Sequence, residues 1–272
     1  MPLIDVPISG IIFAKLHVVI ENRIIQMAIG IYKAAAGMIA GMNRFGAIAN
    51  NLANAGTTGY KRDLQFLRLL TDKQVELARG RSRGAPVKIL VEDQYTDYSQ
   101  GELSETGNRL DVAISGEGFF TLETPRGTAY SRNGSFTLNE DNLLVDYNGN
   151  IVMSESGEIS VSGSEININR NGEIEVDGGN AGKLRIVTFE DLTQLRKIGN
   201  SLYVPLDESV TPEVPRKSYI ISQGYLETSN VNLVSEMITM ITLGKEFEAN
   251  QKIIQTNDEL MRLEAREMGK VR

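Results

Sequence analysis

The sequence predicts an α+β fold that is mainly β, with one long helix near each end of the chain and an all-β insert between them. Apolar and small residues recur at steps of four and three before residue 53 and again after residue 231, which is the spacing of one helix face. Between residues 84 and 226, short alternating segments are separated by Asn-Gly pairs, as in strands joined by hairpins. We expect the two helices to pair as a coiled-coil-like module.

Composition limits the classes of protein that fit. The chain has 272 residues, of which 41% are hydrophobic and 23% charged, so it has neither a disordered nor a membrane composition. It has no cysteine, and His17 is its single histidine. A thiolate nucleophile, a Ser-His-Asp triad or a multi-histidine metal site is therefore not expected, and no cofactor is predicted.

Charge is distributed unevenly. Residues 91–180 hold four arginines and no lysine against seventeen acidic residues, a net charge of −13, which argues against nucleic acid as a partner. Residues 60–88 hold eight basic residues against three acidic ones, with too few interleaved aromatic residues for base stacking. We expect this segment to be solvated or to face another subunit. Its basic residues are Lys61, Arg62, Arg68, Lys73, Arg79, Arg81, Arg83 and Lys88.

Residues 1–26 form a leader. Their apolar run, Ile11–Ile20, is interrupted by Lys15 and His17 and is too short to span a membrane. The leader also lacks the basic start and cleavage site of a secretory signal peptide. Because a clean helical pattern begins at Met27, we expect the native protein to start at or near that residue.

Residues 27–83 are predicted to form the first helix and an extended arm. The helix should run from about Ile29 to Ala53 and end where Asn residues meet Gly56 and Gly59. The arm then opens with Gly59, Tyr60 and Lys61. The residues predicted to form the apolar stripe of this helix are Ile31, Ala35, Met38, Met42, Phe45, Ala49 and Leu52.

Residues 84–226 are predicted to form the β-rich insert. Three Asn-Gly pairs should mark hairpins in which Gly134, Gly149 and Gly172 adopt positive φ. A helical turn is expected at 191–196. The predicted strands lie at about 87–91, 110–114, 118–122, 129–132, 135–138, 143–146, 151–153, 166–174, 183–189, 201–204 and 219–221.

Residues 227–272 are predicted to return the chain to the terminal helix. Ser229 or Asn230 is the expected N-cap, with Glu236 in an early turn. Two polar residues, Gln251 and Asp258, interrupt the predicted stripe. The apolar or small positions of this stripe are Leu233, Met237, Met240, Gly244, Phe247, Ile254 and Met261.

Three segments together resemble the flagellar rod and hook proteins. The first is 47–63, the second is 108–120 with 129–153, and the third is 223–258, and their order matches the helix–β–helix layout of that family. Within the family the chain is most similar to the proximal-rod type, with the distal-rod type close to it. The residues that carry the resemblance are Asn50, Asn51, Asn54, Gly59, Tyr60, Leu110, Asp111, Gly118, Phe119, Phe120, Gly224, Leu226, Glu227, Ser229, Asn230 and Val231.

The resemblance implies a structural subunit of the bacterial flagellar basal-body rod, the axial drive shaft that transmits torque from motor to hook. It implies assembly with further copies and with adjacent rod proteins, in the cell envelope. It also implies export through the flagellar type III apparatus, which agrees with the missing signal peptide. Neither nucleic-acid binding nor membrane insertion is expected.

Two other classes of protein are compatible with parts of the sequence. A glycosidase needs two carboxylates across a cleft, but the obvious candidates alternate with apolar residues, as outward strand positions do. These are Glu155, Glu158, Glu173 and Glu175. Gly116 and Gly118 lie between strands, so they do not form a dinucleotide loop. We therefore expect no enzyme activity. A non-flagellar β-domain that binds a partner as a monomer is the alternative.

Overall fold

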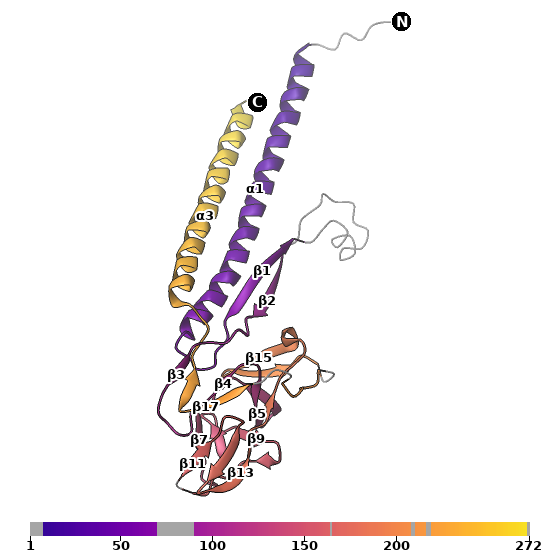
Figure 1. Cartoon of the computed structure of the whole chain (residues 1–272). Helices are drawn as coiled ribbons and strands as arrows, with labels where there is room; N and C mark the ends of the chain where they lie inside the picture. The colour runs from indigo at the N-terminus through magenta and orange to yellow at the C-terminus, as the bar shows by residue number, and fades with distance from the viewer. Residues whose placement is uncertain (1–7, 70–89, 164, 208–209, 216–218, 271–272) are drawn as a thin grey trace. The chain divides into compact units, whose positions relative to one another are not determined.

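The computed structural model describes residues 8–69, 90–163, 165–207, 210–215 and 219–270 (Figure 1). The chain divides into two compact units. One contains the helices up to Ile48 and from Met237 onward, together with the parts of two strands between residues 67 and 92. The other contains residues 49–66 and 93–236, which hold the β-structure of the insert. The predicted α+β class with a β-rich centre is confirmed.

Two long helices dominate the first unit. Helix α1 spans Ile8–Ala53 and helix α3 spans Leu233–Lys270. The predicted start of α1 near Ile29 is wrong, because the helix continues back through most of the leader. The physical reason is that no proline or glycine interrupts the sequence between Gly10 and Gly30, so nothing in it ends the helix.

The two helices run antiparallel (Figure 1). A Cβ atom built on Gly37 would lie 3.4 Å from Nδ2 of Asn250, and one built on Gly30 would lie 3.4 Å from Nδ2 of Asn257. Residue numbers rise by seven on α1 while they fall by seven on α3. The pair therefore has a heptad register, as the predicted coiled-coil-like module requires.

The arm after α1 is more regular than predicted. Strand β1, Asp63–Leu69, pairs with strand β2, Leu90–Thr96, in a two-stranded sheet. At the start of β1, the apolar residues Leu64 and Phe66 alternate with the polar residues Asp63 and Gln65, which is the two-residue period of a strand. The basic residues predicted between 73 and 88 lie outside the described residues.

The largest sheet of the second unit has nine antiparallel strands. Its main path runs β15–β16–β6–β5–β9–β8–β7, while β10 pairs with β9 and β14 pairs with β5. The bounds are β5 Phe119–Thr124, β6 Gly127–Ser131, β7 Phe136–Leu138, β8 Leu144–Asp146, β9 Ile151–Ser154, β10 Gly157–Glu158, β14 Ile186–Val187, β15 Leu195–Gly199 and β16 Leu202–Pro205.

Three smaller antiparallel sheets complete this unit. Strands β11–β12–β13 form a meander, β17 pairs with β4, and β18 pairs with β3. Since β17 and β18 lie at the end of the insert whereas β3 and β4 lie near its start, these pairs close the unit on itself. The bounds are β3 Leu103–Glu105, β4 Val112–Ser115, β11 Ile166–Ile168, β12 Glu173–Val176, β13 Gly179–Lys183, β17 Ile220–Gln223 and β18 Tyr225–Glu227.

The core of the β unit has an aliphatic part and an aromatic part. The aliphatic cluster includes Ile114, Leu122 and Leu184, each at most 1% exposed. The aromatic cluster is built around Phe119 and Tyr203, whose ring centroids lie 5.7 Å apart in an edge-on arrangement. Phe120 lies on the other face of β5 from Phe119 and joins the aliphatic cluster, as strand alternation requires.

Two of the three predicted positive-φ glycines are confirmed. Gly149 and Gly172 have φ of 82° and 85°. Gly134 does not have positive φ, and the strands on either side of it pair with other partners instead of with each other. Gly134 is required for another reason: a Cβ there would lie 1.7 Å from the carbonyl oxygen of Val112.

Two further hairpin turns were not predicted. Asp177 and Gly178 both have positive φ between β12 and β13, as do Asn200 and Ser201 between β15 and β16. The Asp-Gly pair is a known signal for this turn. The Asn-Ser pair is a weaker one, because serine rarely adopts this conformation.

Two smaller predictions concern a helical turn near residue 191 and the N-cap of α3. The predicted helical turn near 191 is present as a 3₁₀ turn, η1, Leu192–Gln194. Neither Ser229 nor Asn230 caps α3. The N-cap is Asn232, whose side-chain oxygen accepts a hydrogen bond of 2.9 Å from the backbone N–H of Ser235. Glu236 does lie in the first turn.

Candidate functional site

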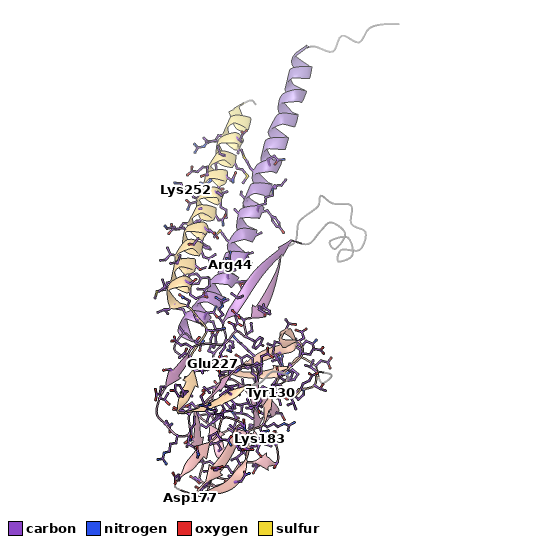
Figure 2. The ribbon with its side chains drawn as sticks, viewed as in Figure 1. Arg44, Tyr130, Asp177, Lys183, Glu227 and Lys252 are labelled. Atoms are coloured by element: carbon purple, nitrogen blue, oxygen red, sulfur yellow. The ribbon has the colours of Figure 1, made fainter. Side chains whose placement is uncertain are left out.

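A buried ion-pair network joins the two ends of the β unit. The Lys61 ammonium pairs with Glu227, and Nη1 of Arg132 lies 3.2 Å from the other oxygen of the same carboxylate. The side chains of Lys61 and Glu227 are fully buried, and that of Arg132 is 6% exposed. We call these three residues the clamp. Figure 2 labels Glu227 within the packed side chains of the β region.

Each member of the clamp has a second polar partner. Lys61 Nζ donates a 2.7 Å hydrogen bond to the Ser99 carbonyl, and the Gly101 N–H donates one of 2.9 Å to Glu227. Arg132 donates to the Gly116 carbonyl at 2.7 Å. Burial lowers the pKa of Lys61 and of Arg132, while the Glu227 carboxylate opposes that shift in both. The network thus offsets the desolvation of three charges.

A second network anchors the end of α1 to the arm. Asn51, which is 1% exposed, donates from Nδ2 to the Asp63 carbonyl and accepts from the Asp63 N–H, both at 2.8 Å. Its Oδ1 also accepts a 3.2 Å hydrogen bond from the Tyr60 hydroxyl. Lys197 of β15 pairs with the Asp63 carboxylate at 2.8 Å and lies 4.3 Å from the centre of the Tyr60 ring. The arm is therefore held from both sides.

The backbone of the arm makes matching contacts with the returning chain. The Gly59 N–H donates to the Glu227 carbonyl at 2.8 Å, and the Arg62 N–H donates to Oδ1 of Asn230 at 2.7 Å. Gly59 has φ of 65°, and a Cβ there would lie 2.4 Å from the Asn133 backbone nitrogen. Only glycine fits this position.

The remaining motif residues position this junction. The Gly224 N–H donates to the Asp111 carbonyl at 2.7 Å, and a Cβ on Gly118 would meet Ile186 at 2.5 Å. Asn54 donates to the Asn50 side chain at 2.8 Å. The other predicted motif residues belong to the core or to the partly buried return segment: Phe119 and Phe120 are core, Leu110 packs on it, and Leu226, Ser229 and Val231 lie in the return segment.

The predicted stripe on α1 is not the face that meets α3. The contacting face carries Gly30, Ala34 and Gly37, whereas the predicted stripe lies one residue further along at each step. Met42 and Phe45 are 63% and 44% exposed. The other predicted residues of that stripe, Ile31, Ala35, Met38, Ala49 and Leu52, are half-buried. Small side chains allow the close approach, so the bulkier stripe stays outside.

The predicted stripe on α3 is split in the same way. Met240, Ile254 and Met261 are half-buried, as is Gly244. Leu233 and Met237 are both 46% exposed, and Phe247 is 36% exposed. The polar positions on the buried side are Asn250 and Asn257, whereas Gln251, predicted to interrupt the stripe, is exposed. Further exposed apolar residues of α3 are Val234, Ile238, Ile241, Ile253, Leu260 and Leu263.

The carboxylates considered for a glycosidase do not form a catalytic pair. Glu155 is exposed and lies 2.7 Å from Lys183, and Glu173 accepts a hydrogen bond from Asn169. Within the described residues, none of Glu155, Glu158, Glu173 and Glu175 lines the cavity of about 630 Å³ beside Phe119 and Arg132. In the same part of the chain, no group of acidic or histidine side chains is placed to hold a metal ion. No described helix is both long and apolar enough to cross a membrane.

Sequence reasoning missed part of the clamp. Lys61 was expected in a segment that is solvated or faces another subunit, but it is fully buried within the chain, and Arg62 pairs with Asp97 at 2.9 Å. Arg132 and Lys197 had no role assigned. One sequence signal could have found the pair. A lysine follows Gly-Tyr in the arm, a glutamate lies in the return segment, and the predicted layout brings these two segments together, so opposite charges could be expected to pair.

Three family models match the chain in the order of its elements. The model described as "Flagella basal body rod protein" matches residues 31–61, "Flagellar hook protein FlgE/F/G D1 domain" matches 113–176, and "Flagellar basal body rod FlgEFG protein C-terminal" matches 222–265. The first of these matches ends at Lys61 and the third contains Glu227, so the clamp joins the two matched segments.

Individual rod and hook-basal body proteins are similar to this chain over nearly their whole length. A flagellar basal-body rod protein FlgG of Agrobacterium fabrum is 36% identical over 84% of this chain and 94% of its own. The hook-basal body complex protein FlhO of Bacillus subtilis is 32% identical over 89% of this chain and 99% of its own. A rod protein FlgF of Caulobacter vibrioides is 31% identical over 82% of this chain and 91% of its own. The chain belongs to the family of flagellar basal-body rod proteins and is a subunit of the basal-body rod.

Proposed function

We propose that this chain polymerises with its own copies and with adjacent rod proteins into the axial shaft of the flagellum, without enzymatic activity. The observation that carries this proposal is the distribution of apolar residues on the two terminal helices. Their small and polar residues face each other within the chain, while bulky residues such as Met42, Ile238 and Ile241 are more than half exposed. Burying such side chains stabilises an interface by about 1.5–3 kcal/mol each.

The clamp supports a mechanical role. It ties the arm after α1 to the segment before α3, so a load applied to either terminal segment is carried by buried ion pairs and by the sheet pairs β17–β4 and β18–β3. A drive shaft needs such cross-links, because torque enters and leaves each subunit through its ends. Export through the flagellar type III apparatus belongs to the same proposal and is supported by the resemblance to the rod family.

We place the chain in the proximal rod, since the segments 38–42, 224–231 and 245–252 are most similar to that type. The distal rod is the alternative, and the 36% identity to a FlgG protein favours it. Electron microscopy of basal bodies from a deletion strain tests both. Loss of the entire rod outward from the proximal segment supports the proposal, and loss of only the outer part supports the alternative. A complete rod in the deletion strain would contradict a structural role.

A further inference from the structure

Three five-residue loops of the β unit have the same construction. In each loop the first residue is Asp or Asn, and its side-chain oxygen accepts hydrogen bonds of 2.8 to 3.0 Å from the backbone N–H groups of the third and fifth residues. The fourth residue of each loop has positive φ. The loops are 139–143, 146–150 and 169–173, and their second residues, which are all exposed, are Glu140, Tyr147 and Arg170.

The fold leaves the choice of the second residue open. The loop is held by the side chain of its first residue and by backbone groups, so a side chain at the second position is not needed to close it. Glu140 and Arg170 are charged, as exposed residues usually are. Tyr147 is 90% exposed, more than any other exposed large hydrophobic residue in the described part of the chain. Folding of the single chain therefore does not explain this tyrosine.

The loop that carries Tyr147 is firmly held between β8 and β9. Nδ2 of Asn150 donates a 2.8 Å hydrogen bond to the Asp146 carboxylate. Nδ2 of Asn200, in the turn between β15 and β16, donates one of 3.2 Å to the side-chain oxygen of Asn148. A tyrosine on a fixed loop loses little conformational entropy when it is buried, and tyrosine is enriched among the residues that dominate protein interfaces.

The cavity of about 630 Å³ in the β unit has the chemistry to receive a tyrosine. Its lining includes the buried rings of Phe119 and Phe189 and the exposed Glu190. The side chain of Arg132, which also lines the cavity, is 6% exposed, and its Nε has no hydrogen-bond partner among the described residues. A tyrosine ring can pack edge-on against the two phenylalanines. Its hydroxyl can accept from Nε of Arg132 and donate to a carboxylate.

Tyr147 does not reach the cavity of its own chain. At the start of β15, the Leu195 carbonyl accepts a 3.4 Å hydrogen bond from Tyr98, which lines the cavity. Just beyond the end of β15, Asn200 contacts Asn148, the neighbour of Tyr147. The five residues of this strand span roughly 16 Å. That is longer than a tyrosine side chain, so a tyrosine from this loop enters the cavity only between two molecules.

We propose that Tyr147 of one subunit inserts into the cavity beside Phe119 and Arg132 of a second copy of this chain. The loop and the cavity are different surfaces of one β unit, so each subunit enters one neighbour and receives another. Such a head-to-tail contact extends into a helical polymer when it does not close into a ring. The inference rests on the proposed function, to which it adds the place where neighbouring β units meet.

Cysteine cross-linking in assembled rods tests this contact. Because the chain has no cysteine, Asn148→Cys subunits carry one thiol beside Tyr147, and Glu190→Cys subunits carry one at the cavity. Basal bodies from cells that make both variants should form a disulfide between residues 148 and 190 on oxidation. Basal bodies with either variant alone should not. The matched control pairs Glu190→Cys with Asn171→Cys, which has the same position in loop 169–173, and should give no such bond.

A subunit with both cysteines tests the head-to-tail geometry. Asn148→Cys/Glu190→Cys protein should give a ladder of cross-linked oligomers, because each subunit then has one thiol for each neighbour. Dimers alone would indicate a closed pair in which each subunit enters the other, and would contradict the proposed extension along the rod.

A competition experiment measures the contribution of Tyr147. In cells that make parent and Tyr147→Ala protein in equal amounts, basal bodies should contain at least about tenfold less of the variant, as expected for a residue that dominates an interface. Tyr147→Phe keeps the ring and should lie between the two. Arg170→Ala, at the same position of loop 169–173, should be incorporated like the parent. Mass spectrometry of purified basal bodies gives these ratios.

Two further outcomes would overturn the proposal without affecting the proposed function. One is a complete rod in which residues 148 and 190 do not cross-link. The other is equal incorporation of Tyr147→Ala and parent protein. Absence of the parent protein from purified rods would instead contradict the proposed function itself.

Discussion

Replacing Glu227 by glutamine should destabilise the β unit more than the corresponding substitution of any other carboxylate that forms an ion pair in this unit. The carboxylate is the only negative charge within the clamp and serves both Lys61 and Arg132. Its neutralisation leaves two buried cations side by side. Breaking a buried pair in this way costs about 3–5 kcal/mol. Near-UV circular dichroism during urea unfolding follows the buried tyrosines of this unit and gives the free energy.

Two further variants make the prediction specific to charge. Lys61→Met leaves Arg132 paired with Glu227, so the clamp becomes neutral and the loss should be clearly smaller than in Glu227→Gln. Glu155→Gln removes an exposed pair with Lys183 and should cost at most about 1 kcal/mol. The reasoning is refuted if Glu227→Gln is as mild as Glu155→Gln, or if Lys61→Met is the more damaging variant of the clamp.

Two other predictions concern the β unit. Gly134→Ala should cost more than about 3 kcal/mol because its Cβ would overlap the Val112 carbonyl, whereas Gly149→Ala, which has open space but positive φ, should cost about 1–2 kcal/mol; equal urea midpoints would contradict this. Burial raises the pKa of several tyrosines, so above pH 10 the unfolded state binds fewer protons and stability should fall as pH rises. Burial lowers the pKa of Lys61 and of Lys197 below the ordinary value of 10.5. Just below pH 10.5 the unfolded state therefore binds more protons at these two lysines, and their contribution to stability rises with pH. The tyrosinate absorbance of these four residues should therefore rise only together with the loss of near-UV dichroism; ionisation of all nine tyrosines of the chain in a fully folded protein would show that these four are accessible. They are Tyr60, Tyr98, Tyr130 and Tyr203.

Local sequence signals predicted the layout well. Helix periodicity located both helices, and Asn-Gly pairs located the hairpins at Gly149 and Gly172, because both signals depend on nearby residues only. The Asn-Gly pair at Gly134 failed as a hairpin signal. There the requirement for glycine comes from Val112, which is distant in sequence, so the local pattern could not show it.

The clamp and the helix faces depend on long-range packing. Lys61 and Glu227 are 166 residues apart, and a basic residue within a basic segment is normally solvated. On the helices, the sequence predicts that the stripes of large apolar residues pack on each other or against neighbouring subunits. The structure places glycine and alanine at the contact between the helices. Periodicity identifies an apolar face but does not say whether it is buried within the chain or by a neighbouring subunit.

The most direct test of the account is the motility of cells that make Met42→Asp protein. Met42 is 63% exposed in the single chain, so a carboxylate there should leave the subunit folded. In a polymer the same position would be buried, where a carboxylate is costly. We expect a folded, exported subunit that is absent from purified basal bodies, in non-motile cells, while the adjacent Asn43→Asp variant assembles. Full motility with Met42→Asp protein in the rod would contradict assembly through the outer faces of the terminal helices.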